Sequence, residues 1–143
     1  MHKLSDSELD VFKAAMKGAK ADIIDIEDNF YKSDTLKKDS ILHNALVSSK
    51  VIFQNLLINP KEIVDFGDFI YKALPLLSDA IKDYVEIEES GLSTAKVKEE
   101  QTSILEVLHV LSNRITGYYE SYTQEQAEEN EISKQIMEKG SIA

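Results

Sequence analysis

Apolar residues recur at alternating steps of three and four over most of the chain, which is the spacing of one face of an α-helix. In the first such segment, from Ser5 to about Lys32, charged residues fill the positions between them. Ser5 and Glu8 form a capping box at its start. The apolar series of this segment is Leu9, Phe12, Met16, Ala19, Ile23, Ile26 and Phe30. The pattern predicts an amphipathic helix with a solvated charged face.

A second segment follows the turn-forming cluster Ser33-Asp34-Thr35. Its apolar surface is broader than that of the first, which favours a central position with two neighbouring helices. The segment ends at Asn59-Pro60, because the residue before a proline avoids the helical region. Proline itself suits the first turn of a new helix, so we expect the next one to begin near Lys61.

The third segment keeps an unbroken three-four apolar series from Ile63 to Ile87 and should end at about Glu89. Pro75 lies inside it. A proline there removes one backbone hydrogen bond and clashes with the carbonyl of Tyr71. We therefore predict a kink at this point in the helix.

A fourth apolar series runs from Val97 to Tyr122, after a helix stop at Ser90-Gly91. Beyond Tyr122 the series fades, and residues 123–131 contain several glutamates but neither Lys nor Arg. We predict a helical bundle domain over residues 1–122 and an acidic C-terminal extension over residues 123–143, either helical or frayed.

Taken together, these segments predict an all-α fold. The expected architecture is an elongated, antiparallel four-helix bundle with a kinked third helix and a long C-terminal helix, because short connections favour antiparallel neighbours. A chain of 143 residues is long enough to bury an independent core.

The charge narrows the range of partners. Lys and Arg number 16 against 26 Asp and Glu, which gives a formal net charge of -10. Such a surface is repelled by nucleic acid and by anionic lipid, and Arg114 is the sole arginine available for bidentate recognition of phosphate. There is no cysteine, so disulfides and thiolate chemistry are excluded.

No apolar run approaches the ~20 residues of a membrane span, and residues 1–20 do not resemble a secretory signal. We expect no membrane span in this chain and a cytoplasmic location.

Two strings have the spacing of metal ligands. Glu106 and His109 match the Glu-x-x-His pattern of di-iron bundles, but that site needs a second string and two more inward-facing glutamates. Leu108 and Leu111 occupy the core stripe, which turns Glu106 toward solvent and leaves His109 at its edge. Asp79 and Asp83 lie one turn apart, and a solvated face is favoured over an ion site. We expect no metal and no cofactor.

The remaining histidines offer no catalytic arrangement. Asp39 lies four residues before His43, which predicts a surface ion pair rather than a catalytic dyad, since no third group or pocket motif accompanies it. His2 belongs to the terminus. The sequence shows no phosphate-binding loop.

Tyr118, Tyr119 and Tyr122 form an aromatic cluster in the fourth segment. Tyr118 and Tyr122 are on the core stripe, and Tyr119 is expected to be more exposed. Core packing is the favoured interpretation, and a protein-interaction surface is the functional alternative.

Several of these features coincide in a known family. Asn59-Pro60, the aromatic-rich stretch from Phe66 to Tyr71, Leu74-Pro75 and the helix from Ile81 to Glu88 resemble the bacterial 5-bromo-4-chloroindolyl phosphate hydrolysis protein family, also called XpaC. The resemblance covers roughly Leu4 to Tyr122.

This resemblance implies an all-helical protein whose family name comes from a phosphatase-like phenotype. It also implies relatives encoded near toxic-anion (tellurite) resistance proteins, and it brings no catalytic motif. Many members carry hydrophobic membrane segments before the helical region, and this sequence departs from that pattern.

We expect a non-enzymatic interaction or assembly module of a bacterial cytoplasm, linked to stress or toxic-anion resistance. Its partner is expected to be a protein, and the acidic charge favours a basic one. The alternative is self-association through apolar positions of the helical stripes that the bundle leaves exposed. The competing function is a phosphate-ester hydrolase, as the family name implies.

Overall fold

The computed structural model describes residues 4–142 and confirms the all-α fold, because these residues form helices and no strand. In chain order the helices are α1 (Asp6–Lys32), α2 (Asp34–Lys37), α3 (Ser40–Ile58), the 3₁₀ helix η1 (Pro60–Phe66), the π-helix η2 (Phe69–Ala73), α4 (Leu74–Glu89) and α5 (Ala95–Ile142). The capping box predicted at Ser5 is present at the start of α1.

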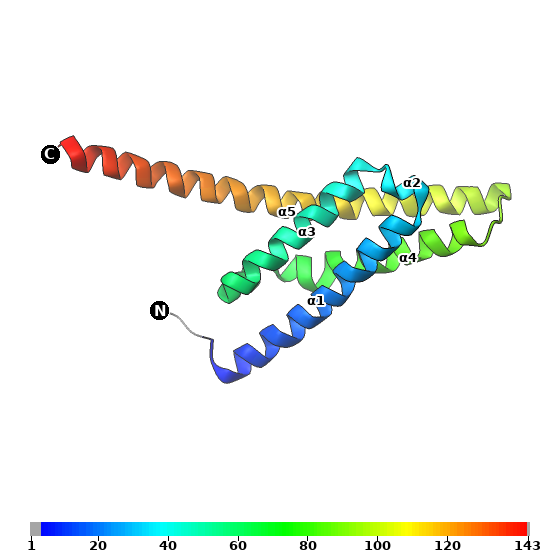
Figure 1. The fold of residues 1–143 in the computed structure, drawn as a ribbon, viewed down its shortest axis with the longest axis horizontal. Coiled ribbons are helices and arrows are strands. Elements are labelled where there is room, and N and C mark those ends of the chain that lie inside the picture. The colour runs from blue at the N-terminus through cyan, green and yellow to red at the C-terminus, as the bar shows by residue number, and fades with distance from the viewer. Residues whose placement is uncertain (1–3, 143) are drawn as a thin grey trace.

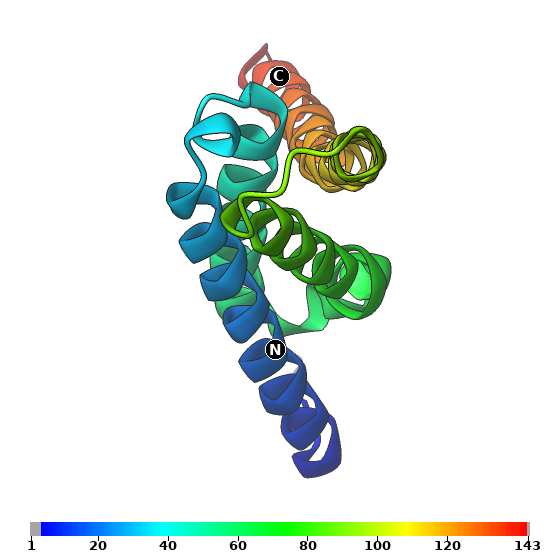
Figure 2. The same ribbon diagram turned by 90° about the vertical axis from the view of Figure 1, so that its right-hand side faces the viewer.

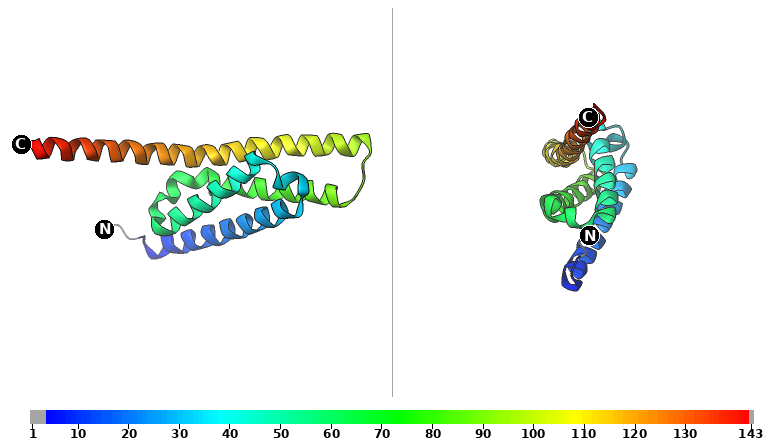
Figure 3. Two further views of the ribbon diagram at one scale, coloured as in Figure 1. Left: turned by 45° about the horizontal axis from the view of Figure 1, so that its top comes forward. Right: turned by 90° about the vertical axis from the view of Figure 1, so that its left-hand side faces the viewer.

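The four long helices reverse direction at each step along the chain, so that α1 and α4 run one way while α3 and α5 run the other (Figures 1 and 3). The closely packed pairs are α1 with α3, α1 with α4, α3 with α5, and α4 with α5. Two of these pairs, α1–α4 and α3–α5, are parallel neighbours. The expectation that neighbouring helices are antiparallel therefore holds for the packed pairs α1–α3 and α4–α5. It does not hold for the other two packed pairs. Figure 2 shows this packing along the length of the molecule.

The core is built from the predicted apolar series. Side chains of α3, α4 and α5 that are completely or almost completely buried meet in its centre, and α1 contributes a stripe from Phe12 to Phe30. The central residues are Leu42, Ile52, Leu56, Leu74, Leu77, Ile81, Leu108 and Ile115. Burial of these side chains is the main favourable term in folding.

The third predicted segment is not one kinked α-helix but three helix types in succession. The N–H of Leu74 donates to the carbonyl of Phe69, five residues back, and this bond closes the π-turn. Pro75 then lies in the first turn of α4, where its missing N–H needs no partner. In a continuous α-helix, residue 75 would donate its N–H to the carbonyl of Tyr71, which proline cannot do. The π-turn inserts one extra residue before Pro75, so this hydrogen bond is not required. The proline thus changes the helix type that precedes it.

Helix α4 ends at the predicted Ser90-Gly91 turn, where Gly91 has a φ of 72°, a conformation that favours glycine. Helix α5 then continues without interruption to Ile142, so the acidic extension is helical. It projects well past the other helices, at the end of the molecule where α1 begins (Figure 3). Every side chain from Ala127 to Lys139 is exposed.

Helix α3 is long and apolar enough to cross a membrane, with a mean hydropathy of 1.2 over its best window. A core helix of a soluble protein meets the same criteria, and here α3 packs against both α1 and α5. The absence of a membrane span therefore stays a prediction.

Candidate functional site

An acidic groove of about 230 Å³ lies between η1 and α5. It contains two of the three predicted tyrosines in its wall. Among the residues that the structure describes, four carboxylates line it and no Lys or Arg does. The lining residues are Glu62, Asp65, Phe66, Tyr118, Ser121, Tyr122, Glu125, Gln126 and Glu129.

Helix geometry aligns the carboxylates. Side chains three residues apart stand above one another in a 3₁₀ helix, so Glu62 and Asp65 share one side of η1. In an α-helix the corresponding spacing is four, so Glu125 and Glu129 share one side of α5. Each helix therefore presents a pair of carboxylates to the groove.

Aromatic rings form the inner part of the groove. The ring of Tyr122 packs on Phe66, with 5.9 Å between the centroids. Burial raises the pKa of the Tyr122 hydroxyl, and the charges of Glu62 and Glu129 raise it further. Tyr118 accepts a hydrogen bond from Nε of Arg114 at 3.1 Å. Tyr119 does not line the groove and is half-buried against the core, although the sequence favoured exposure there.

Of the four acids, Glu62 is the one whose carboxylate has a buried oxygen atom, Oε2, without a hydrogen-bond partner within residues 4–142. Partial burial raises the pKa of Glu62, and the nearby charges of Asp65 and Glu129 raise it further. The neighbouring Arg114 does not relieve this repulsion, because its Nη2 donates to Asp68 at 2.6 Å. A cation in the groove would supply the missing partner.

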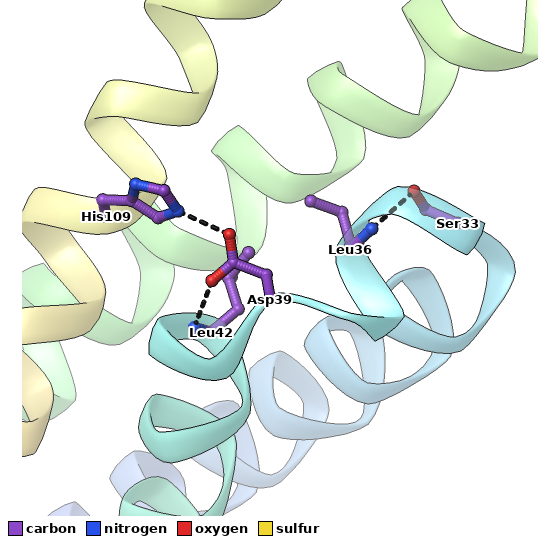
Figure 4. Close-up of polar contacts among 5 residues, drawn as sticks. All are labelled: Ser33, Leu36, Asp39, Leu42 and His109. Carbon is purple, nitrogen blue, oxygen red and sulfur yellow. Dashed lines mark hydrogen bonds and ion pairs between the residues drawn. The ribbon is translucent and has the colours of Figure 1, made fainter.

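The predicted ion pair between Asp39 and His43 is wrong. Asp39 is the N-cap of α3, outside the helical region of the backbone, so the four-residue spacing within a helix does not apply to it. One of its oxygens accepts the N–H of Leu42 at 3.0 Å, and the other lies 2.6 Å from Nε2 of His109 (Figure 4). His43 is exposed and lies near the ring of Phe30.

The same connection contains a second polar anchor that sequence reasoning missed. Ser33 is completely buried, accepts the N–H of Leu36 at 3.1 Å and donates to Glu88 of α4 at 3.0 Å (Figure 4 shows the first bond). The residues from Ser33 to Asp39 thus attach the α1–α3 corner to both α4 and α5. The turn-forming composition was visible in the sequence, but the partners 55 and 70 residues away were not.

The other predicted candidates do not assemble into a site. Glu106 is exposed, and Asp79 and Asp83 are exposed on α4. Lys82 pairs with Asp25 of α1 at 3.0 Å, close to Asp22 and Asp79. Across residues 4–142, no three His, Asp or Glu side chains converge as a metal site would require. His2 lies outside the described residues.

Comparison with known families identifies a family model that covers most of the chain. The family model described as 5-bromo-4-chloroindolyl phosphate hydrolysis protein matches residues 1–132. The chain belongs to this family. The resemblance inferred from the proline and aromatic positions is thereby confirmed. No curated protein and no solved structure gives a significant match.

The region shared with the 5-bromo-4-chloroindolyl phosphate hydrolysis protein family includes every residue of the acidic groove and both residues of the Asp39–His109 pair. It ends within the exposed part of α5. The family description refers to a phosphate ester, whereas the groove is lined by acids.

Proposed function

We propose that this family member is a non-enzymatic interaction module of the bacterial cytoplasm, and that its acidic groove binds a basic segment of a partner protein. The observation that carries this proposal is the buried, unpartnered Oε2 of Glu62 among Asp65, Glu125 and Glu129. Repulsion among these groups is relieved when a cation enters.

The lining of the groove suits a lysine or arginine side chain. Carboxylates on two helices give charge-assisted hydrogen bonds to an ammonium or guanidinium group. The rings of Tyr118 and Tyr122 offer an apolar surface to the methylene stem and a π-face to the cation. The net charge of -10 attracts a basic partner over a longer range at low salt.

Calorimetric titration with a hexalysine peptide tests the proposal. We expect wild-type protein to bind the peptide with an affinity that falls as salt is added, and Glu125→Gln/Glu129→Gln to bind at least about tenfold more weakly. Glu99→Gln/Glu100→Gln, which removes the same charge from the other end of α5, is the matched control and should bind like wild type. Equal binding by both double variants, or no binding by wild type, would overturn the proposal.

A phosphate-ester hydrolase is the second candidate, and the family description is the observation that favours it. The groove would repel a phosphate ester, and the side chains of Arg114 and His109 are engaged by Asp68 and Asp39. We expect purified protein to hydrolyse 5-bromo-4-chloroindolyl phosphate no faster than buffer. A measurable rate abolished by Asp79→Asn, Asp83→Asn or His109→Ala would establish the hydrolase instead.

A further inference from the structure

The extension of α5 has an exposed face on which two acidic positions are followed by two apolar ones. Its members are spaced by four, three and four residues, which places them on one side of the helix. Ile132 is 57% exposed and Ile136 is 65% exposed. This acidic-apolar face consists of Glu125, Glu129, Ile132 and Ile136.

The outer side of α1 has a face of complementary character with the same spacing. Its lysines are exposed, and none takes part in an ion pair within the described chain. Ile24 is 48% exposed and, with Lys20 and Phe53, lines an apolar groove of about 230 Å³ between α1 and α3. This basic face consists of Lys13, Lys17, Lys20 and Ile24.

We propose that the partner of the acidic groove is a second copy of this chain, whose basic face on α1 docks parallel to the acidic-apolar face on α5. This inference rests on the proposed function, since Glu125 and Glu129 belong to both surfaces. Because both faces have the same spacing and α-helices share one rise per residue, the register follows directly. It sets Lys13 against Glu125, Lys17 against Glu129, the stem of Lys20 on Ile132, and Ile24 against Ile136.

The opposite direction gives a poorer match. An antiparallel arrangement would set Lys13 against Ile136 and Ile24 against Glu125, leaving a charge on an apolar side chain at each end. The parallel register instead pairs charge with charge and places Ile136 beside the apolar groove between α1 and α3.

One copy cannot make this contact by itself. Within the chain α1 and α5 run in opposite directions and are not a closely packed pair (Figures 1 and 3). A two-fold axis perpendicular to the long axis reverses α5 of the second copy, which makes it parallel to α1 of the first. The extension projects at the end where α1 begins, so each copy reaches the other there. Symmetry uses the contact twice, so each helix pair needs to supply only half of the ~1,200–2,000 Å² typical of a stable interface.

Charge reversal of the full chain tests the arrangement. We expect wild-type protein to change from monomer to dimer with rising concentration in sedimentation velocity. Lys13→Glu/Lys17→Glu and Glu125→Lys/Glu129→Lys should each raise the dimer dissociation constant by at least about tenfold. An equimolar mixture of the two reversed chains should restore dimers, because each reversed face again meets its complement. All four substituted side chains are exposed, so folding should be retained, and circular dichroism checks this.

The matched controls are Lys96→Glu/Lys98→Glu and Glu99→Lys/Glu100→Lys, which make equal charge changes at the other end of α5 and should dimerise like wild type. Wild-type protein that stays monomeric, a dimer insensitive to either reversal, or a mixture that does not restore dimers would overturn the inference. Hexalysine binding separates the two proposals. A monomer that binds the peptide through Glu125 and Glu129 retains the proposed function without self-association, whereas a monomer that does not bind it contradicts both.

Discussion

At the scale of single residues, Asp39 joins two helices with one carboxylate. It caps α3 through the N–H of Leu42 and contacts His109 on α5. The Asp39 side chain is only 16% exposed, so water cannot fully replace either partner. A single residue in a short connection thereby fixes where α3 begins and where α5 lies against it.

Asp39→Ala should therefore lower the free energy of unfolding by ~1–3 kcal/mol, because it removes the N-cap and leaves His109 without its partner. Asp39→Asn keeps a capping oxygen and should lie between Asp39→Ala and wild type. Urea unfolding provides the measurement. Asp34→Ala is the control, since the Asp34 side chain is 94% exposed and pairs with Lys37 at the surface, and it should change stability by less than ~0.5 kcal/mol. Equal losses for Asp34→Ala and Asp39→Ala would contradict the assigned role.

The raised pKa of Glu62 gives a second prediction at this scale. Burial and the charges of Asp65 and Glu129 raise this pKa above its ordinary value of 4.5, so the charged carboxylate destabilises the fold at neutral pH. This cost is fully present above the folded-state pKa, declines as the pH falls through that pKa, and is absent below 4.5.

Glu62→Gln should accordingly raise the Tm at pH 7, and the gain should disappear as the pH approaches 4. Thermal unfolding followed by circular dichroism across this range is the measurement. Glu99→Gln, an exposed position at the other end of α5, controls for the change in net charge. A gain that is independent of pH would show that charge repulsion in the groove is not its cause.

At the scale of elements, departures from regular α-helix position the groove. The 3₁₀ geometry of η1 aligns Glu62 with Asp65 three residues apart. The π-turn of η2 then allows Pro75 to enter the first turn of α4.

The extension of α5 is the second element with a distinct role. Its side chains from Ala127 to Lys139 are exposed, so they contribute little to the core of one chain. A chain shortened to end at Tyr122 should keep its Tm within ~2 °C of the full-length value in dilute solution. Its ellipticity should fall by the share of helix removed. A large loss of Tm would contradict the division into a bundle domain and an extension.

At the scale of the whole molecule, the direction of the helices decides which surfaces can meet. Charge is distributed unevenly, with lysines on the outer side of α1 that form no ion pair within the described chain and carboxylates on α5 and η1. α1 and α5 run in opposite directions, and the basic face on α1 does not meet the acidic-apolar face on α5 within one chain. Both faces are therefore exposed to the surroundings of the molecule. An outward-directed match of charge and spacing supports the proposal of an interaction module.

The sequence by itself determined the all-α class, the ends of most helices, the core stripes and the family, because these depend on local periodicity, capping and proline chemistry. It also singled out Tyr118 and Tyr122, which the structure places in the wall of the acidic groove. Only the tertiary structure decided that Asp39 meets His109, that Glu62 and Asp65 face Glu125 and Glu129, and that α1 lies beside α4. Helical patterns define which side of a helix is buried but not which helix covers it, so contacts between residues far apart in the chain depend on the packing of the whole molecule.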